Sequence, residues 1–369
     1  MVKCKACGCE RHNLKEHFLG GREPSCTMTL QTYLNTYPGA PVISELFLQK
    51  LNGLREKRGD MNLTIQKLDP KDVFGVATMG DFKVTGFLEK TKYVPEIDPD
   101  YIFPSDVLKV VLLGLETNRP LLIHGPTGSG KTELVRQICA RLNRPCIRVN
   151  NFADMYSSHI LGNMRVKNGA TYFEYGPLPF AMPRPMVFLS DEWDALNPEV
   201  GFVYQPVLER QRTTGTLGSL LLTENGNERI DSHPMFRFIA TSNTCGLGDD
   251  KGHYQGTQLQ NLAFISRFQL RIKLDYLKEK EEIKILKKNF PTIADPEAAS
   301  LAKVAKLIRE QYEGGQINIP YSTRDLLNWA DIYLMIGNPQ KAMEHTCTSI
   351  LPFSDAKKVS EIIQRVFAA

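Results

Sequence analysis

The sequence predicts an α/β fold in which helices cover both faces of a parallel sheet, with a helix-rich tail and a small cysteine-rich module at the start. Three observations lead to this prediction. Short apolar runs alternate with helical stretches between about residues 105 and 275. The remaining residues to 369 have mainly helical patterns. Four of the eight cysteines lie within the first 26 residues.

Four apolar runs have the length and composition of buried strands. They cover residues 120–124, 146–149, 186–190 and 236–241. Residues 133–142 have the spacing of a helix and follow the first run directly. Because a strand, a helix and a second strand in this order usually form a parallel unit, we expect one sheet built from all four runs.

The overall composition is that of a folded protein rather than a disordered or membrane-spanning one. The 369 residues are 42% hydrophobic and 23% charged, and the net charge is only +4. No apolar run is long enough to span a bilayer, and the polar, cysteine-rich N-terminus does not resemble a secretory signal. We therefore expect a cytoplasmic protein without a membrane partner.

Residues 125–132 read GPTGSGKT and match the phosphate-loop pattern G-x-x-x-x-G-K-[ST] in full. Glycines allow the backbone to wrap a polyphosphate, and the N–H groups at the start of the following helix attract it. The lysine would reach the β and γ phosphates, and the threonine hydroxyl would bind Mg²⁺. The residues predicted to bind ATP here are Gly125, Pro126, Thr127, Gly128, Ser129, Gly130, Lys131, Thr132 and Glu133.

Two carboxylates follow the third apolar run, in the segment MVFLSDEWDAL. Asp191 is predicted to hold Mg²⁺ together with Thr132, and Glu192 to orient or deprotonate the attacking water. Asp194 is a weaker candidate ligand, and we expect it to cap the next helix.

Three further polar residues are candidates for the catalytic site. Asn243 follows the fourth apolar run, where ligands collect in open parallel sheets, although an asparagine there can also simply form a turn. Arg267 could reach the ATP of a neighbouring copy. Arg324 is expected in the first turn of a helix that begins at Ser322 or Thr323, a position that favours an anion as its partner. Either arginine could instead be a solvated surface residue.

Taken in order, GPTGSGKT, FLSDEWDA, ATSNT, ISRF and STRDLL resemble the AAA+ ATPases of the MoxR branch, and among them the ATPase subunit of aerobic cobaltochelatase. The resemblance implies a P-loop core with a helical lid and a hexameric ring with ATP between subunits. It implies that Asn243 is the sensor-1 residue, Arg267 the finger acting in trans and Arg324 the sensor-2 residue. It also implies a protein partner with a von Willebrand A-type domain.

With this resemblance, the chain is expected to divide into four regions. Residues 1–60 would form a zinc-finger-like module, and 61–104 a linker that ends in an extended, proline-rich strap. Residues 105–275 would form the AAA+ nucleotide-binding core, and 276–369 the helical lid.

The N-terminal cluster predicts a zinc site. Cys4 and Cys7 are spaced as a ligand pair, and thiolate with imidazole in this number suits tetrahedral Zn²⁺. The segment resembles short zinc fingers that precede a tail like its YLNTYPGAP, which implies His17 and Cys26 as the other ligands. Cys9 and His12 compete for the fourth position. Residues 1–60 carry nine Lys/Arg against six Asp/Glu, which is compatible with contact to DNA or to protein.

Three functions remain in competition. The first is an ATP-driven ring that remodels a protein partner, and the second is a motor that engages DNA through the zinc finger. The third is a scaffold that binds ATP without hydrolysing it. The Asp191–Glu192 pair disfavours the scaffold, because a scaffold needs no water-activating carboxylate.

Overall fold

The computed structural model describes residues 61, 63–76, 82–248 and 256–368, and the two short strands β1 (Val2–Lys3) and β2 (Glu10–Arg11). The chain divides into two compact units, Met1–Asn62 and Leu63–Ala369. In the first unit, β1 and β2 pair antiparallel. The predicted zinc ligands Cys4, Cys7, His17 and Cys26 and their competitors Cys9 and His12 lie outside the described residues, so the zinc module stays a prediction.

The second unit is built on a five-stranded sheet in the order β13-β5-β12-β9-β6. Its strands are β5 (Leu121–His124), β6 (Cys146–Asn150), β9 (Val187–Asp191), β12 (Arg237–Ser242) and β13 (Leu270–Lys273). Every neighbouring pair is parallel. The predicted α/β class and the four predicted strands are therefore confirmed. Since all strands run in one direction, their carboxyl ends meet at one edge of the sheet.

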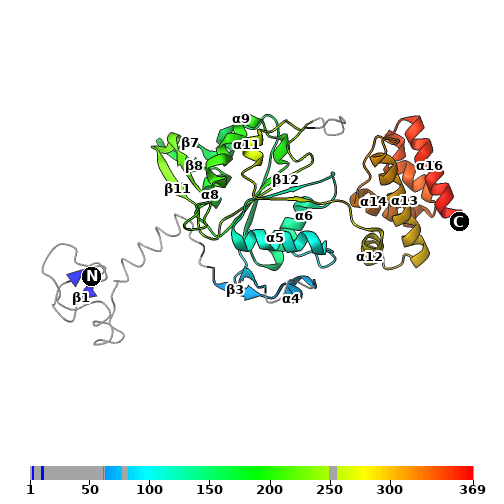
Figure 1. The fold of residues 1–369 in the computed structure, drawn as a ribbon, viewed down its shortest axis with the longest axis horizontal. Helices are drawn as coiled ribbons and strands as arrows, with labels where there is room; N and C mark the ends of the chain where they lie inside the picture. Colours follow the sequence, from blue (N-terminus) through cyan, green and yellow to red (C-terminus); the bar gives the residue numbers. More distant parts are fainter. Residues whose placement is uncertain are drawn as a thin grey trace. The chain divides into compact units, whose positions relative to one another are not determined.

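Helices α5 (Ser105–Thr117) and α6 (Lys131–Arg141) cover one face of the sheet (Figure 1). Their apolar side chains form one hydrophobic cluster with inward-facing residues of the strands, such as Ile123, Leu189 and Ile239. The helical spacing of Leu134, Val135 and Ile138 places these apolar residues of α6 on the side that faces this cluster.

Aromatic side chains cover the opposite face. Phe188 and Phe238 stack with ring centroids 5.3 Å apart, and Trp193 packs edge-on against Phe264 and Phe268 at 5.0 and 5.3 Å. Phe264 belongs to the short helix α11 (Leu262–Ile265). The segment that carries Arg267 is thereby fixed to the sheet.

The predicted linker contains small regular elements. Strands β3 (Ile65–Leu68) and β4 (Val84–Phe87) pair antiparallel, and the short helix α4 (Pro70–Phe74) follows β3. Residues 88–104 contain no helix or strand, in agreement with the predicted extended strap. Four-residue strands with mixed polarity give too weak an alternation to be recognised from the sequence.

Two antiparallel hairpins interrupt the α/β core. One joins β7 (Gly162–Lys167) to β8 (Ala170–Tyr175), and the other joins β10 (Ser219–Leu222) to β11 (Glu228–Asp231). The first turns at Asn168 and Gly169, both with positive φ, as a two-residue hairpin loop requires. Four short helices lie beside them: α7 (Ser157–Leu161), α8 (Pro177–Ala181), α9 (Pro198–Gly201) and α10 (Gln205–Leu208).

The C-terminal part is a helical bundle (Figure 1). It has its own hydrophobic cluster, which includes the fully buried Trp329. Its helices are α12 (Glu279–Asn289), α13 (Asp295–Glu313), α14 (Thr323–Ile336), α15 (Pro339–Thr346) and α16 (Phe353–Phe367). Ser322 and Asp325 form a capping box that fixes the start of α14, as the sequence predicts. No helix among the described residues is long and apolar enough to cross a membrane.

Candidate nucleotide site

The loop between β5 and α6 can only be built from glycine at two of its positions. Gly125 has φ +153°, and an added Cβ would lie 2.0 Å from the carbonyl oxygen of Leu274. Gly128 has φ +70°, and an added Cβ would lie 2.2 Å from Cβ of Ser322. The loop therefore approaches both the last strand and the start of α14 as closely as backbone allows.

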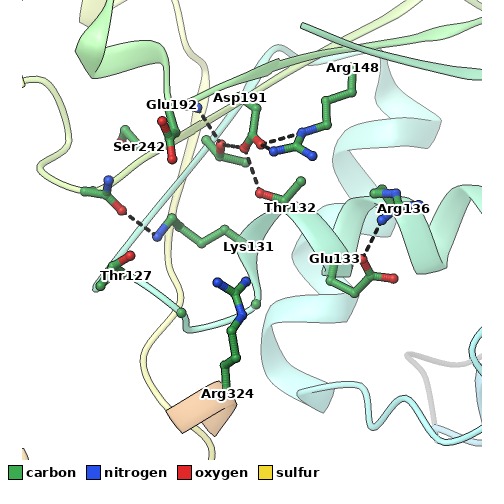
Figure 2. A pocket seen from close by; sticks show the side chains of 14 residues that line it. Thr127, Lys131, Thr132, Glu133, Arg136, Arg148, Asp191, Glu192, Ser242 and Arg324 are labelled. Carbon is green, nitrogen blue, oxygen red and sulfur yellow. Dashed lines mark hydrogen bonds and ion pairs between the residues drawn. The ribbon is translucent and has the colours of Figure 1, made fainter. Parts of the chain in front are cut away.

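This loop borders a cavity of about 330 Å³ (Figure 2). The lining includes residues from the ends of β9 and β12, from α6 and from the first turn of α14. They are Thr127, Gly128, Gly130, Lys131, Thr132, Glu133, Arg136, Arg148, Asp191, Glu192, Thr241, Ser242, Asn243 and Arg324. The structure thus brings most of the predicted ATP-site residues to one place, with Arg324 reaching in from the helical bundle.

Lys131 is buried and donates three hydrogen bonds of 2.9 Å, to the carbonyl oxygens of Gly125 and Pro126 and to Oδ1 of Asn243. Burial lowers the pKa of its ammonium to about 8, although Asp194, Asp191 and Glu192 favour the charged form. Phosphate oxygens could replace these three oxygens as hydrogen-bond acceptors for the ammonium of Lys131. The arrangement suits a lysine that binds a polyphosphate.

The carboxylate of Asp191 is fixed from three sides. Its Oδ1 accepts from the hydroxyl of Thr132 at 2.7 Å and from the hydroxyl of Thr241. Its Oδ2 accepts from the guanidinium of Arg148, at 2.7 Å from Nε and 2.6 Å from Nη2. The paired oxygens of Thr132 and Asp191 are the hard ligands that Mg²⁺ prefers, so the donor set fits the predicted metal.

Two serines at or next to the phosphate loop carry buried hydroxyl groups. Among the described residues, Oγ of Ser129 and Oγ of Ser242 are buried without a hydrogen-bond partner. Ser129 belongs to the phosphate loop, and Ser242 lines the cavity. Buried hydroxyls are normally paired, and a polyphosphate in the cavity would supply an acceptor for Ser242.

Glu192 has a strained backbone and an exposed side chain. Its φ is +52°, in the left-handed region that a glutamate rarely occupies. The hydroxyl of Thr241 accepts its backbone N–H at 3.2 Å and helps to hold this conformation. The strain turns the carboxylate into the cavity, where Figure 2 shows it near Lys131.

Asp194 corrects one expectation from the sequence, because it does not cap the following helix. Asn197 does so, with its side chain accepting from the N–H of Glu199 at 3.0 Å. Asp194 is fully buried, and its Oδ2 accepts from the backbone N–H groups of Asn243 and Thr244, both at 2.9 Å. It thereby holds the loop that carries Asn243.

Arg324 lines the cavity, and the residue before it is held by a polar network. Thr323, the residue before it, donates to Oε1 of Glu282 at 2.9 Å. Glu282 in turn forms a bidentate ion pair with Arg309, at 2.7 and 2.9 Å. The guanidinium of Arg309 lies 4.5 Å from the ring of Tyr276, whose hydroxyl donates to the carbonyl of Thr127 at 3.0 Å. The bundle and the phosphate loop are therefore connected by direct contacts.

Arg267 does not line the cavity of its own chain. Its Nη1 lies 2.6 Å from Oε1 of Glu209, and its side chain is 30% exposed. The structure therefore separates Arg267 from the other predicted catalytic residues. Its action on a neighbouring copy remains a prediction.

Sequence reasoning missed Arg148 and Thr241. Each lies inside a strand that is recognised in the sequence by its hydrophobic residues, so its polar residues were not considered as site residues. A polar residue within two positions of the carboxyl end of a buried strand is the signal that could have found them.

The comparisons with known proteins agree with this geometry. A family model described as AAA domain (dynein-related subfamily) matches residues 120–268, and one described as CbbQ/NirQ/NorQ C-terminal matches residues 282–369. The aerobic cobaltochelatase subunit CobS of a Sinorhizobium species is 34% identical, with 83% of this chain and 92% of the relative covered. Protein NorQ of Paracoccus denitrificans is 29% identical, with coverage of 39% and 51%.

Among solved structures, a RuvB protein of Thermotoga maritima has a TM-score of 0.45 at 18% identity, with 75% of this chain and 81% of that chain covered. The match to CobS spans nearly its whole length. The chain therefore belongs to the MoxR-type AAA+ ATPases, P-loop NTPases that use ATP and Mg²⁺.

Proposed function

We propose that this chain forms a hexameric ring that couples ATP hydrolysis to the remodelling of a protein partner, as a chelatase-type motor. The observation that carries the proposal is the position of Arg267. It is fixed on the sheet by the aromatic cluster around Phe264, yet it lies outside its own cavity. An arginine so placed completes a nucleotide site only when a second copy docks against it. The similarity to CobS over 92% of that protein supports the motor class.

In the proposed reaction, the backbone amides of 125–130 and the ammonium of Lys131 bind the phosphates of ATP. Thr132 and Asp191 would hold Mg²⁺, which neutralises phosphate charge when bound. Glu192 orients a water in line with the γ-phosphorus and accepts its proton, while the bond to the β–γ bridging oxygen breaks. Asn243 polarises that water.

Two arginines complete the site. Arg324 transmits to the helical bundle, through Thr323 and Glu282, whether the γ-phosphate is present. Arg267 of the adjacent copy compensates the charge that develops on the transferred phosphoryl group.

The partner that we propose is a protein with a von Willebrand A-type domain. The N-terminal module would bind Zn²⁺ through Cys4, Cys7, His17 and Cys26 and would contact that partner or DNA. A DNA-engaging motor is the alternative function, and its basis is the excess of basic residues in 1–60.

Two substitutions test the ATPase proposal. Glu192→Gln is expected to keep ATP affinity and to lose turnover, because the amide cannot accept a proton from water. Lys131→Ala is expected to lose affinity itself. Equilibrium binding of a fluorescent ATP analogue and phosphate release separate the two effects. Turnover that survives in Glu192→Gln would remove that residue from its role.

A second experiment separates the two partners. ATP turnover by the full chain is measured with a von Willebrand A-type protein and, separately, with duplex DNA over a range of salt concentrations. Stimulation by the protein alone supports the proposed function. Stimulation by DNA that falls steeply with salt supports the alternative.

A further inference from the structure

We propose that Arg148 competes with Mg²⁺ for the carboxylate of Asp191 and so sets the Mg²⁺ concentration at which the chain binds nucleotide. This inference rests on the proposed function, since it concerns the same site. It adds a residue that the phosphate-loop and carboxylate motifs do not contain.

The hydrogen-bonding positions of the Asp191 carboxylate are already occupied. A carboxylate has about four positions for hydrogen bonds. The hydroxyls of Thr132 and Thr241 take two of them at Oδ1, and the two donors of Arg148 take two at Oδ2. The side chain of Asp191 is only 3% exposed. A metal ion that uses Oδ2, directly or through a bound water, therefore has to replace or share the contact with Arg148.

The positive charge of Arg148 also opposes a metal ion at Asp191. The guanidinium of Arg148 places a positive charge directly against the carboxylate of Asp191. Arg148 also lines the cavity in which the phosphates would bind. Mg²⁺ bound at Thr132 and Asp191 would meet Coulomb repulsion from this charge, and even at the dielectric constant of water such a repulsion is significant over a few ångströms.

The side chain of Arg148 is free to move away from Asp191 because much of it is exposed. It lies on β6, whose register places Asn150 opposite Asp191 and Arg148 opposite Leu189. The side chain reaches forward along the strand to the carboxylate, and it is 48% exposed. An arginine with this exposure can turn toward solvent or toward a phosphate oxygen, and Mg²⁺ would then replace it as the cation beside the buried carboxylate of Asp191.

A second arginine of the same cavity provides the matched control. Arg136 lies on α6 and pairs with Oε2 of Glu133 at 3.0 Å, with no hydrogen bond to Asp191. Replacing either arginine by glutamine removes one positive charge from the cavity. Only the Arg148 replacement removes the cation from Asp191, and the new amide can still donate a hydrogen bond to it.

The experiment measures binding, not activity. Equilibrium affinity for a fluorescent, non-hydrolysable ATP analogue is titrated against free Mg²⁺ in the full chain, for wild type, Arg148→Gln, Arg148→Lys and Arg136→Gln. Thermal melting of each variant checks that it folds. Arg148→Gln is expected to lower the Mg²⁺ midpoint about tenfold. Arg148→Lys and Arg136→Gln are expected to stay near the wild-type midpoint.

Other outcomes overturn the inference. An unchanged or higher midpoint in Arg148→Gln shows that the guanidinium does not oppose the metal. An equal decrease in Arg148→Gln and Arg136→Gln shows a general effect of cavity charge. A loss of affinity in EDTA that is confined to Arg148→Gln shows that Arg148 serves the phosphates. If wild type binds no nucleotide at any Mg²⁺ concentration, the proposed function fails instead.

Discussion

Thr241 lies beside Asp191 on the neighbouring strand, and its hydroxyl donates a hydrogen bond to the carboxylate. The same hydroxyl oxygen accepts the backbone N–H of Glu192 at 3.2 Å. One side chain thus positions both the proposed metal ligand and the proposed general base. Thr241 belongs to the segment ATSNT, but its role depends on the pairing of its strand with the strand of Asp191, which the segment itself does not specify.

Thr241→Val keeps the shape of this side chain and removes the hydroxyl. We expect turnover to fall about tenfold, the effect of losing roughly one hydrogen bond in the transition state, with ATP affinity close to that of wild type. Steady-state phosphate release gives kcat and KM. Thr241→Ser restores the hydroxyl and should recover most of the rate. If the valine and serine variants are equally slow, the hydroxyl is not the cause.

Arg267→Ala is expected to keep ATP affinity and to reduce turnover by about 10³ or more, as for other arginine fingers. Mixing it with Glu192→Gln should recover measurable turnover. Such a mixture contains sites in which an intact Glu192 faces an intact Arg267 from the next copy. A mixture as inactive as either variant alone would argue against action in trans. Arg271→Ala removes a neighbouring exposed arginine and serves as the control.

Gly128→Ala is expected to abolish tight ATP binding. The new methyl group would overlap Cβ of Ser322, so the phosphate loop and the start of α14 cannot both keep their positions. Gly75→Ala is the matched control, because Gly75 has a similar φ of +66° and nothing within 4 Å of an added Cβ. The control should cost about 1 kcal/mol of stability and leave ATP affinity unchanged. Fluorescent ATP binding and urea unfolding measure both variants.

Arg309→Gln is expected to destabilise the helical bundle by about 3–5 kcal/mol, because it leaves the carboxylate of Glu282 buried without its ion pair. Glu282 is almost fully buried, so water cannot replace the lost partner. Lys306→Gln removes an exposed cation on the same helix and should cost less than about 1 kcal/mol. Urea unfolding followed by circular dichroism compares them. Equal decreases in the free energy of unfolding of the two variants would mean that the buried ion pair stabilises the bundle no more than an exposed cation does.

Much of the core could be predicted from the sequence because it depends on strong local signals. The apolar runs that became β5, β9 and β12 are bounded by glycine, proline and acidic residues, so their lengths are visible. The phosphate loop was found because its glycines are required by backbone geometry. Arg324 was expected in the first turn of a helix beginning at Ser322 or Thr323, and α14 does begin at Thr323, with Ser322 as its N-cap.

The rest depends on contacts between distant residues. Asp194 looks like a helix cap in the sequence, yet it binds backbone groups 49 and 50 positions later. The pairing of Arg148 with Asp191 joins positions 43 apart on adjacent strands. Nothing in the local pattern around either residue specifies its partner. The hairpin β10–β11 was not predicted either, because its second strand, Glu228–Asp231, contains a single apolar residue and gives no strand signal.

The hydrophobic cluster on the α5 and α6 face of the sheet and the cluster of the helical bundle share no residue. Heating should therefore melt them as separate cooperative units. If the bundle melts first, Arg324 leaves the phosphate cradle while the sheet remains intact. ATP binding would then be lost at a temperature below the main calorimetric transition. Added nucleotide, which contacts both the sheet and the bundle, would bring the two melting temperatures closer together.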